Sequence, residues 1–363
     1  MKVLNLIWGF TTGGGIDKCF LTYAKMGEMD KGIAMVNVCI QLGNMEANMG
    51  PLNAINTHFI TIISRKDLSW AKKLRKLIEE VNPDVLFSHG FNGAIVLWIE
   101  RLMGVKKDIV LTYHGLYNPP TSSRKPLAIL YNSLPVWIYK HIARQVVCVS
   151  EDSRKQLLER GVPDTKAVTV YNGIDHQVTG KKVELHNDMV NIVSCSRIDA
   201  IKGLNYLLEA LARLKLEGYA FHYYMIGDGP ELDSLKKASE ALDLEGLVSF
   251  VGYQNNVAEW LNGADIFAIT SLQENHSIAV LEAMRAGKAI VATNVGGNGE
   301  SIRDGVDGLL VPAKDVTSLV DALRKLIADI SLREKLSASA RERFTQLFTE
   351  EAMLKNLISV LKN

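Results

Sequence analysis

The segment 271–287 holds the densest group of residues that could do chemistry. After an apolar run, a loop carries Glu274, and a helix is predicted to begin near Ser277, a good N-cap residue, and to end before Gly287. The free backbone N–H groups at the start of this helix could bind a phosphate. Glu282 could accept hydrogen bonds from two ribose hydroxyls, with Glu274 nearer a transferred group. The alternative is a surface loop with two solvated acids.

Arg197 and Lys202 form a second candidate group, with Gly203 directly after them. They flank a predicted turn between a strand and a helix. Two cations at such a turn could neutralise a diphosphate leaving group, in place of a divalent metal ion. The alternative is a pair of solvated cations.

Several glycines and histidines follow predicted strands of the first half. Gly13, Gly14 and Gly15 come after the first strand, where the lack of side chains lets backbone approach a ligand closely; a purely structural turn is the alternative. His114 and His89 each end an apolar run. One of the two is expected to line the acceptor side.

In their order and spacing, these segments resemble family 4 of the retaining glycosyltransferases, which have the GT-B fold. The resemblance covers nearly the whole chain. Its most specific element is E-x7-E followed by A-M-x-A-G, from Glu274 to Gly287. The other matching elements are R-x4-K-G at 197–203, G-x-G-P at 227–230, V-G-Y at 251–253, V-S-E at 149–151 and N-G-I-D at 172–175. The last two are expected to be mainly structural, with Ser150 capping the next helix.

The resemblance assigns roles to individual residues. Arg197 and Lys202 would stabilise the leaving diphosphate, Glu274 would orient donor hydroxyls, and His114 would lie close to the transferred sugar; these four are the expected catalytic residues. The implied mechanism is a front-face reaction in which the leaving diphosphate accepts the proton of the acceptor. The expected nucleotide-sugar-binding residues are Gly14, Gly15, Arg197, Lys202, Gly252, Tyr253, Glu274, Asn275, His276, Ser277, Ile278 and Glu282. The family often has a Glu-Arg pair where this chain has Asp17 and Lys18, so these two receive no acceptor role.

The elements that must position these residues alternate strand and helix in both halves of the chain. Strands are predicted at 3–8, 34–41, 85–88, 109–113, 145–149, 190–195, 222–226, 248–251, 266–269 and 289–292. The expected fold is α/β, with two Rossmann-like doubly wound domains facing across a cleft. The expected domains are an acceptor-side domain at 1–172, a linker at 173–189 and a nucleotide-sugar-binding domain at 190–345. A C-terminal helix at 346–363 is expected to cross back to the first domain, by analogy with the family.

Composition excludes several other classes of protein. With 363 residues, 47% hydrophobic and 22% charged, and a net charge of +1, the chain is neither disordered nor a dedicated nucleic-acid binder. The sequence has no G-x-G-x-x-G, Walker A, D-x-D or H-E-x-x-H pattern, so we expect no cofactor and no metal ion. Four cysteines without a C-x-x-C pair indicate reduced thiols and a cytoplasmic location. The N-terminus is predicted to be a strand rather than a signal peptide, and no transmembrane helix is predicted.

Two basic segments suggest that the chain binds an anionic membrane surface at the inner face of a membrane. The first contains Arg65, Lys66, Lys72, Lys73, Arg75 and Lys76. The second, from Arg124 to Arg144, interleaves four cations with Tyr131, Trp137 and Tyr139. The alternatives are a solvated helix face and a packed crossover helix.

The sequence therefore predicts a metal-independent retaining glycosyltransferase. It would move a hexose or N-acetylhexosamine from a nucleotide-diphosphate sugar, with a UDP-sugar expected first and GDP-mannose second. The acceptor would be a glycan or a lipid-linked glycan. The alternatives are a sugar-nucleotide hydrolase or epimerase on the same fold, and an inactive nucleotide-binding homologue.

Overall fold

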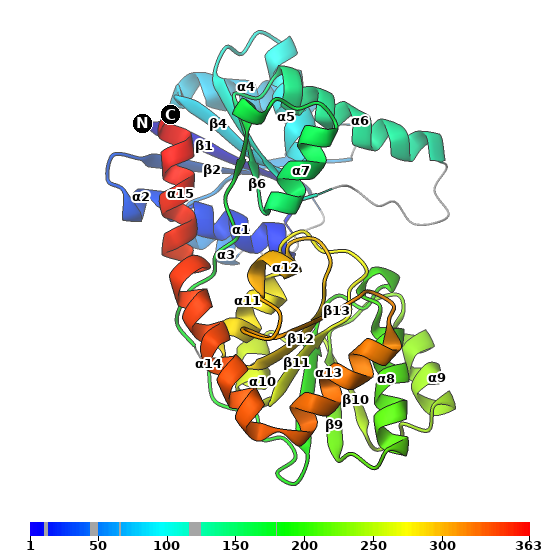
Figure 1. Cartoon of the computed structure of the whole chain (residues 1–363). Helices are drawn as coiled ribbons and strands as arrows, with labels where there is room; N and C mark the ends of the chain where they lie inside the picture. The colour runs from blue at the N-terminus through cyan, green and yellow to red at the C-terminus, as the bar shows by residue number, and fades with distance from the viewer. Residues whose placement is uncertain (11–13, 44–49, 65–66, 116–124, 179) are drawn as a thin grey trace. The chain divides into compact units, whose positions relative to one another are not determined.

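The chain forms two compact units in the computed structural model, which describes residues 1–10, 14–43, 50–64, 67–115, 125–178 and 180–363 (Figure 1). Unit 1 contains Met1–Gly173 and Glu350–Asn363, and unit 2 contains Ile174–Thr349. The chain passes from one unit to the other within the N-G-I-D element and returns just before Glu350. Most of the predicted linker, from Ile174 onward, is thus grouped with unit 2.

A seven-stranded parallel sheet forms the centre of unit 1, in the order β3-β2-β1-β4-β5-β6-β7. Short apolar runs form such strands because helices cover both faces of a parallel sheet. The strands are β1 (Lys2–Trp8), β2 (Ala34–Leu42), β3 (His58–Ile62), β4 (Val85–His89), β5 (Asp108–Tyr113), β6 (Gln145–Cys148) and β7 (Ala167–Thr169).

The helices of unit 1 bury one apolar face each. On α4, Trp70, Ala71, Leu74 and Ile78 recur at helical spacing and enter the core, while the lysines lie on the opposite face. The helices are α1 (Gly15–Tyr23), α2 (Met26–Met29), α3 (Gly50–Ala54), α4 (Ser69–Val81), α5 (Gly90–Leu102), α6 (Lys125–His141), α7 (Glu151–Glu159) and α15 (Glu350–Lys362).

Unit 2 repeats this plan with a six-stranded parallel sheet in the order β10-β9-β8-β11-β12-β13. The strands are β8 (Val190–Cys195), β9 (Phe221–Ile226), β10 (Val248–Gly252), β11 (Ile266–Ile269), β12 (Ala289–Thr293) and β13 (Leu309–Val311). In both units the strand order reverses beside the first strand, which leaves a crevice beyond the carboxyl ends of the two adjacent strands. In unit 2 these strands are β8 and β11, with Ile192 opposite Ile266.

Helices also surround the sheet of unit 2. They are α8 (Leu204–Leu216), α9 (Leu232–Ala241), α10 (Val257–Gly263), α11 (Ile278–Arg285), α12 (Asn298–Ser301), α13 (Val316–Ala328) and α14 (Ile330–Leu347). Leu207, Leu208, Leu211 and Leu214 of α8 are fully buried against the sheet and α13. The alternating parallel α/β fold predicted from the sequence is confirmed in both units.

The C-terminal helix α15 belongs to unit 1, as expected (Figure 1). Lys25 Nζ lies 3.0 Å from Glu350 Oε1 at the start of α15. At its other end, Arg144 Nη2 donates to the carbonyl oxygen of Leu361 at 3.0 Å. Cations at a helix C-terminus are favourable because they compensate the exposed carbonyl dipoles.

Three strands were not predicted: β3, β7 and β13. Two of them have only three residues, and β3 begins with the polar His58, so none forms a conspicuous apolar run. The helix α6 continues through Pro135.

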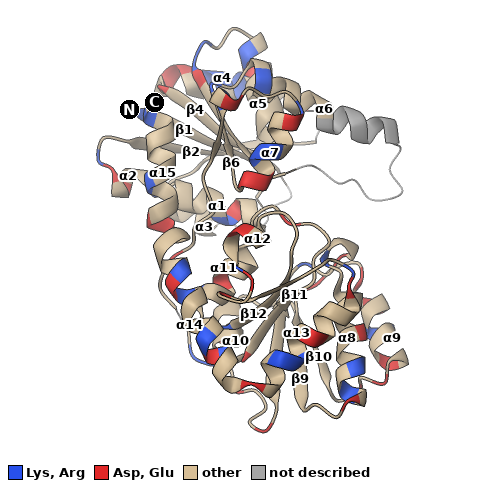
Figure 2. Cartoon of the chain, viewed as in Figure 1, with Lys and Arg blue, Asp and Glu red and all other residues tan. Residues whose placement is uncertain are grey.

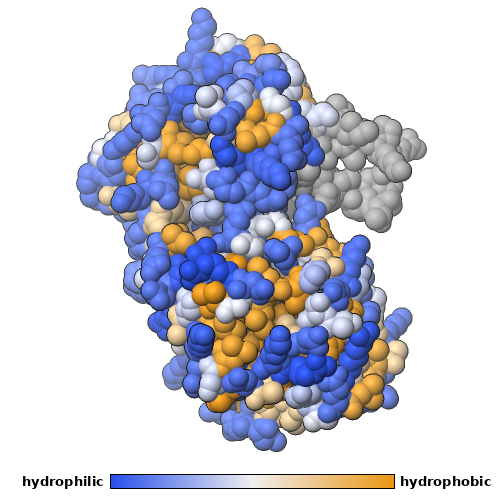
Figure 3. Space-filling model, in the orientation of Figure 1, coloured by the Kyte–Doolittle hydropathy of each residue, from blue (hydrophilic) through white to orange (hydrophobic). Residues whose placement is uncertain are grey.

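Within the described residues, none of the helices is both long and apolar enough to cross a membrane. In Figure 3 the visible surface of each unit is mostly hydrophilic, with separate hydrophobic areas. Buried apolar side chains form a large cluster on the sheet of each unit, and unit 1 has a further, smaller cluster that contains Ile7, Phe10 and Phe20.

Candidate active site

Lys202 and Glu274, 72 positions apart, form an ion pair in unit 2. Lys202 Nζ lies 2.6 Å from Glu274 Oε1, and the hydroxyl of Ser271 donates to the same oxygen at 2.7 Å. Both charged side chains are largely buried, with exposed fractions of 21% and 11%. They meet because they follow β8 and β11, the neighbouring strands at the point where the sheet order reverses.

Arg197 lies on the same turn but has a different partner. Its guanidinium pairs with the carboxylate of Asp199, and its side chain is 75% exposed. The turn ends in a 3₁₀ helix, Ala200–Lys202, followed by Gly203 in the left-handed region at φ +58°. An added Cβ at Gly203 would lie 2.4 Å from the carbonyl oxygen of Thr270, so this glycine lets the turn approach the end of β11 closely.

The G-D-G-P turn packs directly against the turn that carries Arg197. Gly227 has a φ of +137°, and a Cβ there would lie 1.9 Å from the carbonyl oxygen of Ser196. The backbone N–H of Ile198 donates to the carbonyl oxygen of Asp228 at 2.8 Å. The turn therefore supports the loop that carries Arg197.

The predicted helix after Glu274 is α11. Ser277 is its N-cap, with its hydroxyl accepting from the N–H of Val280 at 3.5 Å, and Gly287 follows the helix at φ +62°. Ile278 is its first residue. Glu282 is half-buried on the same helix. Both predicted ends of the helix are confirmed.

Two glycines that sequence reasoning missed hold the loop before α11. A Cβ at Gly296 would lie 1.7 Å from the carbonyl oxygen of Glu274, and one at Gly297 would lie 2.2 Å from that of Asn275. The N–H of Gly297 donates to the Asn275 carbonyl oxygen at 3.0 Å. The consecutive glycines after β12 were a signal in the sequence, because glycine pairs permit such close backbone contact.

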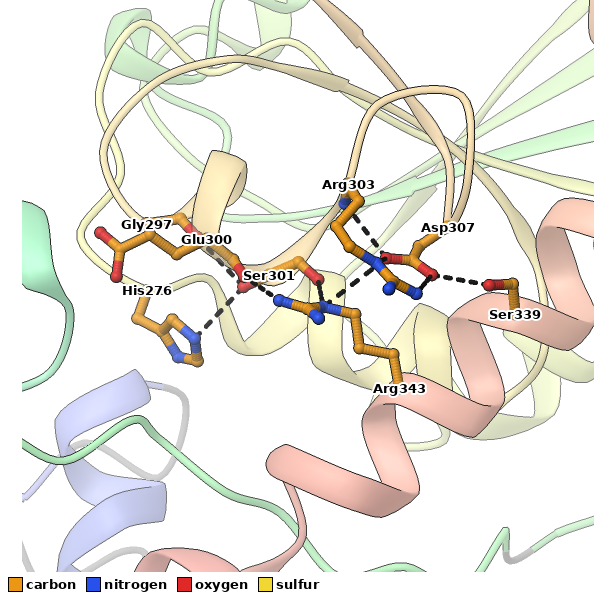
Figure 4. Close-up of polar contacts among 8 residues, drawn as sticks. All are labelled: His276, Gly297, Glu300, Ser301, Arg303, Asp307, Ser339 and Arg343. Carbon is orange, nitrogen blue, oxygen red and sulfur yellow. Dashed lines mark hydrogen bonds and ion pairs between the residues drawn. The ribbon is translucent and has the colours of Figure 1, made fainter.

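His276 belongs to this loop and is buried, and its ring points toward Ser301 of α12 (Figure 4). Its Nε2 lies 3.2 Å from the hydroxyl of Ser301 on α12, and its ring lies 5.3 Å from that of Phe348. Burial lowers the pKa of His276 to about 3. His276 is therefore neutral at physiological pH and anchors the loop to the interior of unit 2.

Arg343 of α14 holds α12 in place from the other side (Figure 4). Its Nε and Nη2 donate to the carbonyl oxygens of Ser301 and Glu300, each at 2.8 Å. The buried carboxylate of Asp307 accepts from Arg303 at 2.6 Å and lies 3.6 Å from Arg343 Nε. Sequence reasoning did not identify this cluster, because its members are polar residues spread over several elements.

Gly252 is the last residue of β10, the strand at the edge of the same sheet, and Tyr253 follows it directly. The carbonyl oxygen of Gly252 accepts from the N–H of Gly227 at 2.9 Å, which joins this segment to the G-D-G-P turn. The ring of Tyr253 is 58% exposed and could stack on a nucleobase.

In unit 1, the glycine loop leads into α1. Gly14 is the N-cap, and its N–H donates to the buried carboxylate of Asp17 at 3.3 Å, while Gly15 is the first helical residue. Asp17 therefore caps the helix from inside. Gly13 lies outside the described residues.

His114 and the rival candidate His89 converge on one hydroxyl. Thr112 Oγ1 lies 3.1 Å from His89 Nδ1 and 3.0 Å from His114 Nε2. Burial lowers the pKa of His114 to about 4. Burial, reinforced by the neighbouring His114, places the pKa of His89 well below its usual range. His89 is only 4% exposed, whereas His114 is half-buried, so only His114 offers much surface to a ligand.

The structure thus brings most of the predicted residues together within each unit. The turns and loops that carry Arg197, Lys202, Glu274 and Gly252 are joined by direct contacts in unit 2. In unit 1, His114 and His89 both contact the hydroxyl of Thr112. Within the described ranges, no group of three or more His, Cys, Asp or Glu side chains could hold a metal ion.

Comparison with known proteins identifies the class. Residues 179–343 match the family Glycosyl transferases group 1, and residues 51–178 match Glycosyltransferase Family 4. The structure of HepE from Anabaena in complex with UDP-glucose superposes with a TM-score of 0.82 at 19% identity, covering 100% of this chain and 99% of that one. The fold is that of the GT-B glycosyltransferases.

Three relatives extend this similarity. The chain is 30% identical over 300 residues to alpha-D-kanosaminyltransferase of Streptomyces kanamyceticus, with 76% of each protein covered. It is 28% identical over 298 residues to N-acetyl-alpha-D-glucosaminyl L-malate synthase of Bacillus anthracis, covering 79% of this chain and 77% of that protein. It is 24% identical over 324 residues to the UDP-Gal:alpha-D-GlcNAc-diphosphoundecaprenol alpha-1,3-galactosyltransferase of Escherichia coli, covering 82% and 83%. The chain belongs to glycosyltransferase family 4.

Proposed function

We propose that this glycosyltransferase moves a hexose or N-acetylhexosamine from a UDP-sugar to a glycan or lipid-linked glycan, with retention of anomeric configuration and without a metal ion. The observation that carries the proposal is the Lys202–Glu274 pair beside the start of α11. It combines a cation for the diphosphate with a carboxylate for the sugar hydroxyls.

The leaving group needs positive charge as its bond to the sugar breaks. Lys202 is held within a largely buried site, where a charge interacts more strongly than in water. Arg197 lies on the same turn; its guanidinium pairs with Asp199, and because its side chain is 75% exposed it can exchange this partner for the diphosphate. In the proposed front-face mechanism, these two cations stabilise the diphosphate while it accepts the proton of the attacking hydroxyl, and Glu274 orients the donor sugar.

The choice of UDP rests on similarity. HepE was solved with UDP-glucose, and the Escherichia coli relative carries UDP-Gal in its name. The exposed ring of Tyr253 and the backbone after β10 are the proposed contacts of the base. GDP-mannose is the second candidate donor.

The choice of acceptor also rests on similarity, because the same Escherichia coli relative is named for a diphosphoundecaprenol-linked sugar. We extend the proposal to an anionic membrane surface near unit 1. On α4, Lys72 and Lys76 are exposed, although Lys76 Nζ also lies 3.7 Å from Glu80. Figure 2 colours the Lys and Arg positions of the described residues blue.

Other parts of the two basic segments contribute less to a membrane surface. Arg75 faces the buried Glu100 at 3.7 Å. Trp137 on α6 is 45% exposed, but Tyr139 is buried, which favours the packed-helix alternative for that residue. Arg65, Lys66 and Arg124 lie outside the described residues. Failure to co-sediment with anionic vesicles at low salt would remove this part of the proposal.

A cytoplasmic location at the inner face of a membrane is part of the same proposal. Cys19, Cys39 and Cys148 are buried thiols outside any disulfide bond. Unpaired thiols suit a reducing compartment.

The test is thermal stabilisation by UDP, GDP, ADP and CMP, each with EDTA and with Mg²⁺. A ligand at about a hundred times its Kd stabilises the folded state by about 2.7 kcal/mol. We expect a shift with UDP in EDTA. A shift that requires Mg²⁺ would refute metal independence, and the absence of a shift with every nucleotide would favour an inactive homologue.

The hydrolase alternative needs a separate experiment. UDP release from UDP-glucose is measured with and without a glycan acceptor, and the anomeric configuration of the product is read by NMR. Acceptor-dependent release with an α-linked product supports the proposal, because the donor is itself an α-glycoside. Equal release of free glucose without acceptor would identify a hydrolase.

A further inference from the structure

A chain of hydrogen bonds between side chains runs through the interior of unit 1 and ends at His114. Its first member is the carbonyl oxygen of Ile55, which accepts from Asn37 Nδ2 at 2.9 Å. Asn37 Oδ1 then accepts from Asn5 Nδ2 at 3.0 Å. Asn5 and Asn37 are 0% and 4% exposed, so water does not compete for these groups.

The direction of each hydrogen bond in this chain follows from its first member. A backbone carbonyl can only accept, so the Asn37 amide must present its NH₂ group to Ile55 and its oxygen to Asn5. Asn5 must then present its NH₂ group to Asn37 and its oxygen to His89. The distance between Asn5 Oδ1 and His89 Nε2 is 2.6 Å. An amide oxygen accepts, so the proton of His89 lies on Nε2.

The same reasoning continues across Thr112. A neutral imidazole carries one proton, so His89 Nδ1 has a lone pair and accepts from the Thr112 hydroxyl at 3.1 Å. The Thr112 oxygen has then used its only proton. It can only accept from His114 Nε2, which lies 3.0 Å away. His114 therefore carries its proton on Nε2 and has a lone pair on Nδ1.

The apolar surroundings of His89 keep it neutral, and this fixes which group donates and which accepts in each hydrogen bond of the chain. Its ring is stacked on Tyr23 at 5.1 Å and meets the edges of Phe87 and Phe20 at 4.5 and 5.8 Å. An apolar enclosure disfavours the charged imidazolium, as the lowered pKa of His89 reflects. A protonated His89 would donate to Thr112 from Nδ1 and allow the opposite tautomer of His114.

We propose that Asn37, Asn5, His89 and Thr112 are positioning residues that hold His114 with Nδ1 as a hydrogen-bond acceptor, and that this nitrogen binds a hydroxyl group of a sugar. The inference deepens the proposed function and rests on it for the identity of the ligand. Within the described residues, no hydrogen bond is made by His114 Nδ1. A neutral acceptor nitrogen suits an O–H donor and does not suit the oxygens of a phosphate.

The hydroxyl could belong to the donor sugar or to the acceptor glycan. Both offer the same chemistry to Nδ1, and only separate ligands distinguish them. The probes are UDP, UDP-glucose and free N-acetylglucosamine.

The test is NMR of protein labelled with ¹⁵N in its histidine rings, with the His114 signals assigned from their loss in His114→Asn. We expect the proton of His114 on Nε2 in the natural protein. Thr112→Val keeps the shape of a residue buried in β5 but removes the hydroxyl, and we expect the tautomer preference to be lost. Thr112→Ser keeps the hydroxyl and should restore it. A purely structural role for Thr112 would not change the tautomer, so an unchanged tautomer in Thr112→Val, or a proton on Nδ1 in the natural protein, would overturn the proposal.

Adding each ligand in turn is followed by the same ¹⁵N signals of the His114 ring, and calorimetry verifies that the ligand is bound. A shift of His114 Nδ1 with UDP-glucose but not with UDP identifies the donor sugar as the source of the hydroxyl. A shift with N-acetylglucosamine alone identifies the acceptor. A shift already complete with UDP, or none with bound UDP-glucose and with N-acetylglucosamine, contradicts sugar binding at Nδ1. If neither UDP nor UDP-glucose binds, the proposed donor fails, while the Thr112 variants still decide the tautomer.

Discussion

Lys202 and Glu274 neutralise each other across two adjacent strands of unit 2, with 2.6 Å between Nζ and Oε1. Neither charge is left alone in a largely buried place, where an unpaired charge is costly. In the proposed function, a nucleotide sugar would share or replace this ion pair when it binds. The pair keeps both side chains in position before the ligand arrives, so little reorganisation is needed.

Lys202→Ala is expected to weaken UDP binding and to lower kcat/KM by about 10²–10³-fold, the cost of losing one preorganised electrostatic contact. Calorimetry with UDP and initial rates of UDP release measure the two effects. Lys236→Ala, which removes an exposed lysine of α9, is the control and should change neither. Normal UDP affinity in Lys202→Ala would place the diphosphate elsewhere.

Glu274→Gln separates sugar contacts from phosphate contacts. The amide oxygen of glutamine can still accept from Lys202 and Ser271, but the negative charge is gone. We expect UDP affinity to change by less than about threefold and turnover of UDP-glucose to fall by about 10²-fold, as for other transition-state contacts. Isothermal titration calorimetry measures the UDP affinity, and steady-state kinetics measure the turnover of UDP-glucose. Equal losses in both quantities would show that Glu274 acts through Lys202 alone.

Gly227→Ala is expected to destabilise unit 2 and to disturb the turn that carries Arg197. Its Cβ would lie 1.9 Å from the Ser196 carbonyl oxygen. We expect a loss of about 3 kcal/mol or more in the free energy of unfolding, because both φ and the contact are unfavourable. Gly246→Ala is the matched control, with φ +75° but nothing within 4 Å of its Cβ, and should cost about 1 kcal/mol. Urea unfolding of both variants gives the comparison.

Arg343→Lys tests whether α14 positions the loop of His276. Lysine keeps the charge beside Asp307 but cannot donate to both the Ser301 and Glu300 carbonyl oxygens. We expect the KM for the nucleotide sugar to rise about tenfold, since a small displacement of a binding loop has a large effect. Arg303→Lys is the control, because Arg303 also binds Asp307, and it should leave KM unchanged. Equal effects of the two substitutions on KM would mean that the Asp307 cluster stabilises unit 2 and that Arg343 has no separate role in positioning the loop of His276.

The buried histidines predict how stability depends on pH. In the unfolded chain a histidine has a pKa of about 6.5, whereas in the folded protein burial lowers the pKa of His276 to about 3. Below pH 6.5 the unfolded state therefore binds a proton that the folded state does not, so stability falls as the pH falls. From pH 6.5 to 5 we expect His276 alone to contribute a loss of about 2 kcal/mol.

Urea unfolding between pH 7 and 5 measures this slope. His276→Gln should make the slope shallower, while replacement of the exposed His58 by Gln should leave it as it is. An unchanged slope in His276→Gln would mean that His276 is accessible to protons in the folded protein.

The order of strands and helices was predictable because it depends on local patterns. Buried parallel strands appear as short apolar runs, and β8 and β11 were predicted with the bounds that the structure has. The caps of α11 were equally readable, since Ser277 and Gly287 act through residues close in sequence. The types and spacing of the charged residues in the E-x7-E and R-x4-K-G elements also sufficed to indicate the class of enzyme.

Only the tertiary structure decided which distant side chains meet. Strand order brings Lys202 to Glu274, and it brings Asn5, Asn37 and His89, from three different strands, into one chain of hydrogen bonds. A single polar residue inside an apolar run carries no local signal of its partner. Pairing of polar groups depends on the register between neighbouring strands, and that register is set by packing over the whole sheet.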